Sequence, residues 1–116
     1  MKSRVVEILQ YRLKTDTGRT FHQIMRDISV PLHVEQGIDV VAYGCSLHDA
    51  DSYFLLRAFE NEEEMHGVLA AFYASESWHS GPREAIIERI EVSLKSVLLL
   101  SPSAIDEMRN SFLAWQ

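Results

Sequence analysis

The segment "SYFLLRAF", residues 52–59, sets the main constraint on the architecture of this protein. Its aromatic and apolar side chains are typical of a β-strand, in which successive side chains point to opposite sides. One side then carries Tyr53, Leu55, Arg57 and Phe59, and the other carries Phe54, Leu56 and Ala58. Because both sides are apolar, the strand belongs in a sheet that is covered on both faces. The sequence therefore predicts two covering layers, one of which must also accommodate the cation of Arg57.

The rest of the chain alternates between strand and helix patterns. The expected strands are 4–14, 38–47, 52–59 and 91–100. The expected helices are 19–34, a helix that begins after Asn61, a shorter helix at 80–90 and a C-terminal helix at 101–116. With the short helix set aside, the order is βαββαβ. This order predicts an α+β, ferredoxin-like sandwich of antiparallel strands with two main helices on one face, followed by an extra C-terminal helix.

Local signals predict where the helices begin and end. Asn61 is the expected N-cap of its helix, and the acidic residues 62–64 that follow suit the positive end of the helix dipole. Thr20 and Gln23 have the spacing of a capping box. Pro31 is expected to kink or break the last turns of the first helix, and Gly37 to end it.

The strand alternation predicts apolar side chains on both faces of the sheet. One set is Val6, Ile8, Val41, Tyr43, Phe54, Leu56, Val97 and Leu99; the other is Leu9, Tyr11, Leu13, Ile38, Val40, Leu55, Phe59, Leu94, Leu98 and Leu100. Two helices, each about 10 Å across, cover one face only. Leaving the second face in water would cost on the order of 10–20 kcal/mol, which rivals the stability of a small domain.

A second copy of the chain is the expected cover for the second face, in an isologous homodimer. Whether such dimers pair into tetramers stays open. The alternative is that the C-terminal helix folds back over this face. A helix of about 12 residues is only about 18 Å long and cannot cover four strands, so we expect it to brace the partner or an outer edge.

Composition excludes several classes of protein. The chain of 116 residues has a net charge of −6, which argues against nucleic acid or an anionic membrane surface as the main partner. Its single cysteine, Cys45, excludes an internal disulfide and a multi-cysteine metal site. The five histidines lack metal-ligand spacing, and no glycine-rich phosphate loop is present, so no metal and no cofactor are expected. No signal peptide or membrane span is evident, and a cytoplasmic location is expected.

Three segments resemble the NIPSNAP family, which belongs to the dimeric α+β barrel superfamily. They are "VVEILQYRLK" (5–14), "GIDVVAYGCSLHDADSYFLLRAF" (37–59) and "AFYASESWHSGPREAI" (71–86). The "SxxW" and "GPRE" elements of the third are the most specific. The resemblance implies a NIPSNAP-like dimeric α+β barrel domain over 1–100 with a helical extension over 101–116, and it implies little about activity.

The superfamily also contains antibiotic-biosynthesis and haem-degrading monooxygenases, whose reactions take place in a cavity between the sheet and its own helices. Haem-degrading members resemble one another in a strand-one Asn, a Trp and a downstream His. Here the first strand offers Gln10 and Tyr11, and Pro82 stands four positions after Trp78. These departures argue against haem degradation.

The candidate ligand pocket between sheet and helices collects the aromatic and charged residues that these patterns favour. They are Tyr11, His22, Tyr53, Arg57, Tyr73, Trp78 and Arg83. Arg57 either pairs with a nearby carboxylate or clamps an anionic ligand. No catalytic residue is assigned. Three hypotheses follow: a homodimer that binds a small apolar or anionic ligand, a cofactor-independent monooxygenase or isomerase acting on a small aromatic substrate, and a scaffold dimer without a ligand.

Overall fold

The computed structural model describes residues 2–115, with Trp115 described in its backbone alone. The elements along the chain are β1 (Arg4–Leu13), α1 (Gly18–Ile24), a π-helical turn η1 (Met25–Ser29), α2 (Val30–Glu35), β2 (Asp39–Cys45), β3 (Ser52–Phe59), α3 (Glu62–Ala74), α4 (Glu76–Ser80), α5 (Arg83–Ile87), β4 (Ile90–Leu100) and α6 (Pro102–Trp115). Within the described range, no helix combines the length and apolar character needed to cross a bilayer.

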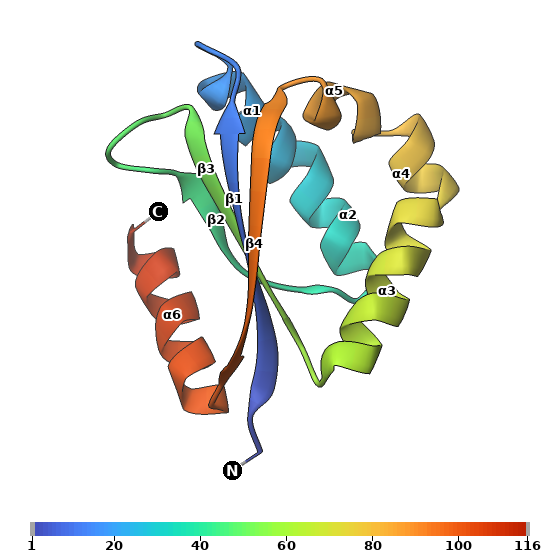
Figure 1. The fold of residues 1–116 in the computed structure, drawn as a ribbon, viewed down its shortest axis with the longest axis vertical. Coiled ribbons are helices and arrows are strands. Elements are labelled where there is room, and N and C mark those ends of the chain that lie inside the picture. The colour runs from blue at the N-terminus through green and yellow to red at the C-terminus, as the bar shows by residue number, and fades with distance from the viewer. Residues whose placement is uncertain (1, 116) are drawn as a thin grey trace.

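The four strands form one antiparallel sheet in the order β2-β3-β1-β4. This confirms the predicted ferredoxin-like α+β architecture. The helices α1 to α5 lie on one side of the sheet, called the inner face below, and α6 lies on the other side, called the second face (Figure 1). The sheet therefore has a covering layer on each side, as residues 52–59 required.

Each face of the sheet has its own apolar core. The inner core includes Val5, Leu9, Leu13, Phe21, Met25, Ile38, Tyr53, Leu55, Phe59, Met65, Leu69, Phe72, Trp78 and Ile86. The smaller second-face core consists of Val6, Val41, Ala42, Leu56, Ala58 and Ile105, with Ile8, Phe54, Leu100, Met108 and Phe112 packed against it. Residues 54, 56 and 58 thus contribute to one core, and 53, 55 and 59 to the other.

Two strands depart from the predicted alternation. Leu99 lies opposite Val5 and Leu98 opposite Val6, so β4 presents Val97 and Leu99 to the inner face and Leu98 to the second face, the reverse of the prediction. In β2 the register shifts between Val40 and Ala42. Such a bulge changes the side to which later residues point, which explains why Tyr43 packs with the inner core and not with Val41.

The predicted first helix is interrupted where proline stands. The π-helical turn η1 ends two residues before Pro31. Pro31 has no N–H to donate to the preceding turn, so the regular α-helical hydrogen bonding is interrupted there. Gly37, at a φ of +80°, ends the segment as predicted. The predicted capping box of Thr20 and Gln23 is wrong, because α1 begins at Gly18 with Thr17 as its N-cap and without a side-chain cap.

The later helices follow their sequence signals more closely. The side chain of Asn61 accepts a hydrogen bond from the Glu64 N–H at 2.7 Å, which confirms the predicted N-cap of α3. The predicted helix over 80–90 is shorter and begins later, as α5, and the separate helix α4 precedes it. Ser75 caps α4 by accepting from the Trp78 N–H at 3.2 Å.

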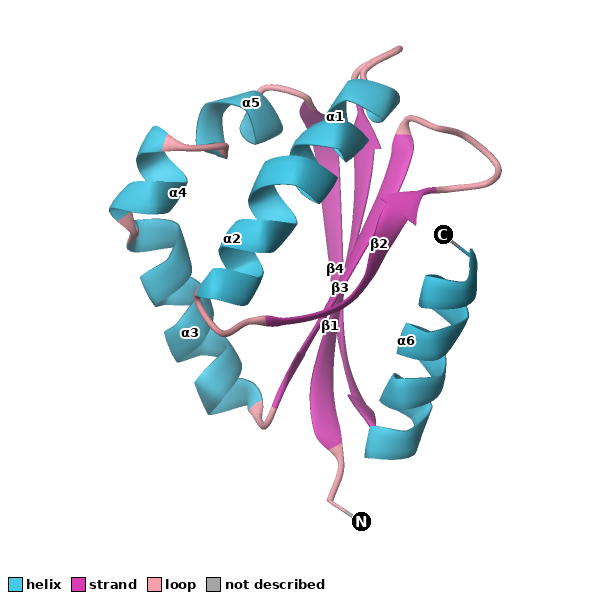
Figure 2. Ribbon diagram, turned by 180° about the vertical axis from the view of Figure 1, so that it is seen from behind, coloured by secondary structure: helices cyan, strands magenta, loops and turns pink. Residues whose placement is uncertain are grey.

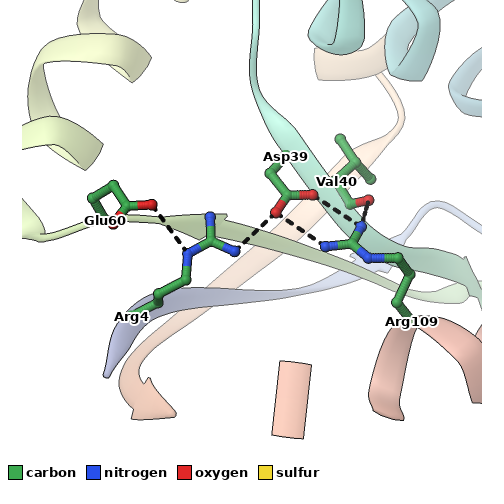
Figure 3. A network of polar contacts seen from close by, with 5 residues as sticks. All are labelled: Arg4, Asp39, Val40, Glu60 and Arg109. Atoms are coloured by element: carbon green, nitrogen blue, oxygen red, sulfur yellow. Dashed lines mark hydrogen bonds and ion pairs between the residues drawn. The ribbon is translucent and has the colours of Figure 1, made fainter. Parts of the chain in front are cut away.

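The C-terminal helix α6 packs on the second face of its own chain, which differs from the expected bracing of a partner or an outer edge (Figure 2). Ile105 is fully buried there. Arg109 adds an ion pair to Asp39 at 2.9 Å and a hydrogen bond to the Val40 carbonyl at 3.2 Å (Figure 3). Asp39 also forms an ion pair with Arg4, with 3.2 Å between Asp39 Oδ2 and Arg4 Nη1. The helix covers the β2 side of this face and leaves Leu94 and Leu98 of β4 exposed, whereas Leu100 is partly buried against the second-face core.

Candidate functional site

Arg57 forms a buried ion pair with Glu7. The two residues lie directly opposite one another on the central strands β3 and β1, so their side chains meet on the inner face. Arg57 Nε donates to Glu7 Oε1 at 2.7 Å, and Nη2 lies 2.5 Å from the same oxygen. Arg57 is 1% exposed and Glu7 is 0% exposed. The structure therefore pairs Arg57 with a carboxylate, one of the two roles considered for it.

His33 completes one side of this pair. Its Nδ1 lies 2.7 Å from the Ser29 carbonyl oxygen, which can only accept, so Nδ1 carries the proton. Its Nε2 is then the acceptor for Arg57 Nη1 at 3.0 Å. Burial, together with the charge of Arg57, lowers the pKa of His33 to about 4, although the bond to Ser29 acts in the opposite direction. His33 is consequently neutral at pH 7.

Tyr73 contacts the same guanidinium nitrogen as His33. Its hydroxyl accepts from Arg57 Nη1 at 2.8 Å, and its ring centroid lies 5.7 Å from Arg57 Cζ. The ring also makes an edge contact with Trp78, with 5.2 Å between centroids. Burial by itself lowers the pKa of Arg57, but Tyr73 and Glu7 outweigh it, so the pKa is raised and the guanidinium keeps its charge.

Lys95 brings a second cation to Glu7. Its Nζ lies 2.9 Å from Glu7 Oε2, and its side chain is 51% exposed because it stands on the edge strand β4. Tyr11, also on β1, has a raised pKa because of burial and of the neighbouring Tyr73 and Glu7, so its hydroxyl stays protonated. We call the six residues Glu7, Tyr11, His33, Arg57, Tyr73 and Lys95 the inner cluster. With His33 neutral, it carries one excess positive charge.

A second polar pair lies beside the inner cluster. Tyr53 stands opposite Tyr11 in the sheet register, and its hydroxyl is 2.7 Å from His22 Nδ1. Burial, followed by the charge of Arg26, lowers the pKa of His22. Burial raises the pKa of Tyr53. A neutral imidazole thus faces a protonated phenol.

Of the predicted pocket residues, the structure places Tyr11, Arg57 and Tyr73 in the inner cluster and Trp78 against it. Arg83 stands apart, since it is exposed on α5 and has no ion pair or side-chain hydrogen bond with another described residue. Sequence reasoning missed Glu7, His33 and Lys95. Only Glu7 had a usable signal, as an acid in an apolar strand in phase with Leu9 and Tyr11.

A surface groove opens elsewhere on the molecule. It measures about 970 Å³, and its apolar lining on the second face comes from Ile8, Phe54, Leu56 and Leu94. Tyr11 and Tyr53 also border it, whereas Arg57, Tyr73 and Trp78 do not. Among residues 2–115, no group of three or more His, Cys, Asp or Glu side chains could hold a metal ion.

The fold is that of a ferredoxin-like α+β domain whose antiparallel sheet has a helical layer on each side. No protein-family model matches the chain, and no curated protein sequence does. Solved structures do match. A crystal structure of an uncharacterized NIPSNAP-like domain protein from Burkholderia xenovorans is 17% identical and aligns with a TM-score of 0.78 over 88% of this chain and 89% of that one.

Two further solved structures have folds similar to that of this chain. A NIPSNAP family protein of unknown function from Agrobacterium tumefaciens is 20% identical, with a TM-score of 0.76 over 86% of this chain and 90% of that one. A protein from Nitrosomonas europaea, assigned as a candidate antibiotic biosynthesis monooxygenase, is 16% identical, with a lower TM-score of 0.62 over 87% of this chain and 91% of that one. The chain therefore has a NIPSNAP-type fold, as the sequence resemblance implied.

Proposed function

We propose that this protein is a homodimer of NIPSNAP type that binds a small anionic aromatic ligand at the inner cluster. The observation that carries this proposal is the excess of positive charge around a fully buried carboxylate: Glu7 meets both Arg57 and Lys95. Half-exposed Lys95 and the ring of Tyr73, which is 37% exposed, form the outer margin of the cluster. A ligand carboxylate could pair with Lys95 there while its ring stacks on Tyr73.

The case for a homodimer rests on β4. On the second face, Leu94 is 61% exposed and Leu98 is 42% exposed, and neither is covered by α6. Full burial of a leucine is worth about 1.5–3 kcal/mol. The strand also lies at the edge of the sheet, where its outer N–H and C=O groups are available for pairing. A second copy placed along β4 would bury both features.

A benzoate titration followed by NMR tests the ligand proposal. We expect shifts at Lys95, Tyr73 and Trp78, and about a tenfold weaker affinity in Lys95→Met, because a charge-assisted hydrogen bond is worth about 1.5–3 kcal/mol. Lys14→Met, which removes an exposed lysine outside the cluster, is the matched control and should bind normally. Unchanged benzoate affinity in Lys95→Met would refute the proposed site. That result would favour the hypothesis of a scaffold dimer without a ligand.

Light scattering tests the homodimer separately. The wild type should scatter as twice its chain mass of 13.3 kDa at micromolar concentration. Leu98→Glu should reduce this to a single chain, because it places a charge in the proposed interface. A well-folded wild-type particle of one chain mass would overturn the dimer proposal.

A second candidate function is cofactor-independent oxidation of a small aromatic substrate. The observation that favours it is the His22–Tyr53 pair, in which a neutral imidazole lies 2.7 Å from a phenol and could exchange a proton with a bound substrate. Oxygen consumption with hydroquinone is the assay. Activity that is lost in both His22→Gln and Tyr53→Phe would favour the enzyme, and activity unaffected by either substitution would dismiss this pair.

A further inference from the structure

The buried carboxylate of Glu7 has one oxygen that no hydrogen bond satisfies. Its Oε1 accepts from Arg57 Nε at 2.7 Å, whereas Oε2 is buried and receives no hydrogen bond from the described part of the chain. Lys95 Nζ lies 2.9 Å from Oε2, but this contact is an ion pair without hydrogen-bond geometry. A buried acceptor without a donor is rare in a folded protein and often marks a functional position.

The surroundings of Glu7 leave Oε2 to a donor from outside. Arg57 directs its contacts to Oε1, to His33 and to Tyr73. On the other side of Glu7 the cross-strand neighbour is Val97, which has no polar side chain. Among the described residues, only Lys95 therefore brings a polar side-chain atom close to Oε2.

Lys95 can give way to such a donor without any movement of the backbone. Its side chain is half exposed, and the lysine stem is flexible. If the ammonium turns toward a ligand carboxylate, Oε2 loses part of its compensation and lies close to a second negative charge. A ligand group that donates a hydrogen bond to Oε2 would offset both effects. This position is on the inner face, whereas the proposed homodimer covers the second face.

The distance between Lys95 Nζ and Glu7 Oε2 limits where the ligand can carry its donor. The two atoms are 2.9 Å apart, and each would make a hydrogen bond of roughly 2.8 Å to the ligand. With open angles at both atoms, the two ligand oxygens lie roughly 5 Å apart. On a benzene ring, a hydroxyl meta to the carboxylate meets this requirement. A para hydroxyl lies too far away, and an ortho hydroxyl bonds its own carboxylate.

On the basis of the function proposed above, we propose that the ligand is a hydroxylated aromatic acid whose hydroxyl, meta to the carboxylate, donates a hydrogen bond to Glu7 Oε2. Lys95 holds the carboxylate of the same ligand. Glu7 is then the residue that determines specificity, because a site that accepts a hydroxyl proton rejects analogues without one.

NMR titrations of the wild type with four acids test the proposal. We expect 3-hydroxybenzoate to bind about tenfold more tightly than benzoate, because it adds a hydrogen bond to a charged acceptor. The analogue 3-methoxybenzoate, which cannot donate, should show no such gain. The isomer 4-hydroxybenzoate, whose hydroxyl is out of reach, should show none either.

Glu7→Gln tests the assignment of the acceptor. Arg57 holds the amide oxygen in place of Oε1, so an NH₂ group replaces the acceptor Oε2. The preference for 3-hydroxybenzoate over 3-methoxybenzoate should then be lost. Glu84→Gln, which changes an exposed acid on α5, is the matched control and should keep this preference. If Glu7→Gln does not fold, the four acids on the wild type decide by themselves.

The outcomes separate this specificity from the anion site itself. Equal affinities of the wild type for 3-hydroxybenzoate and 3-methoxybenzoate would overturn the role of Glu7, and so would a preference that survives in a folded Glu7→Gln. In both cases, benzoate binding that depends on Lys95 would leave the proposed function standing. No binding of any of the four acids would overturn both.

Discussion

Arg57 and Glu7 face one another across the two central strands, and both side chains are almost completely removed from water. The pair forms the centre of a polar cluster between the sheet and the helices. Neutral His33 and the hydroxyl of Tyr73 bond Arg57, and the half-exposed ammonium of Lys95 pairs with Glu7.

Removing Arg57 should be strongly destabilising. In Arg57→Met, Glu7 keeps a buried charge with only Lys95 to compensate it, and we expect a loss of about 3–5 kcal/mol in the free energy of unfolding, measured by urea denaturation. Glu7→Leu combined with Arg57→Met should recover most of this loss, because no buried charge is then left. Arg83→Met, an exposed matched control, should change stability by no more than about 0.5 kcal/mol. A stable single variant would contradict the structural role of the pair.

Acid should weaken the fold through His33. Its pKa is about 4 in the folded chain and 6.5 ordinarily, so between these values the unfolded chain binds a proton that the folded chain does not. The free energy of unfolding therefore falls as the pH is lowered from 6.5 to 4, by about 3 kcal/mol from this residue.

Urea denaturation at several pH values measures the effect. His33→Gln should show a shallower dependence on pH in this window. His66→Gln, which replaces an exposed histidine on α3, should keep the wild-type dependence. Equal slopes for the wild type and His33→Gln would show that His33 is not held neutral.

The attachment of α6 should depend on Asp39. Asp39→Asn loses the charge that both Arg4 and Arg109 contact, and we expect a loss of about 1 kcal/mol at low salt (Figure 3). The loss should shrink in high salt, because these side chains are partly exposed. Asp27→Asn breaks the exposed pair with Arg26 and should cost almost nothing. Chemical denaturation at two salt concentrations distinguishes the two variants.

Two glycines should respond to alanine in opposite ways. A Cβ at Gly18 would lie 1.8 Å from the Ala50 carbonyl oxygen, so Gly18→Ala must push apart α1 and the connection before β3, and should lower the melting temperature markedly. A Cβ at Gly67, inside α3, meets nothing within 4 Å. Gly67→Ala should stabilise the protein by about 0.5–1 kcal/mol. Similar melting temperatures for both variants would contradict the close contact at Gly18.

Several local features could be read directly from the chain because neighbouring residues decide them. Asn61 caps α3 with its own side chain, and Gly37 ends a helix by adopting a positive φ. Asp49 Oδ1 accepts from the Asp51 N–H at 2.8 Å, the turn chemistry typical of aspartate. The βαββαβ order follows from such signals together with the apolar periodicities. The fold class was therefore predictable.

The candidate site was predictable only in part. The aromatic or charged character of Arg57, Tyr73, Trp78 and Tyr11 makes them predictable as site residues, but nothing local identifies Lys95 as their neighbour. Its contact with Glu7 depends on which residue of β4 stands opposite which residue of β1. His33 turns toward Arg57 from α2, directly after the π-helical turn. Neither the register of β4 nor the orientation of His33 can be predicted from a short stretch of sequence.

The alternation in 52–59, which requires a layer on each side of the sheet, follows from the amino-acid order alone. How those layers are filled depends on long-range packing: α6 lies over β2, a bulge in that strand turns Tyr43 inward, and Arg57 pairs with Glu7. The physical reason is the sequence distance over which the interactions act. Periodicity and capping act over a few residues, whereas strand register, helix docking and buried charge pairing join residues that are tens of positions apart.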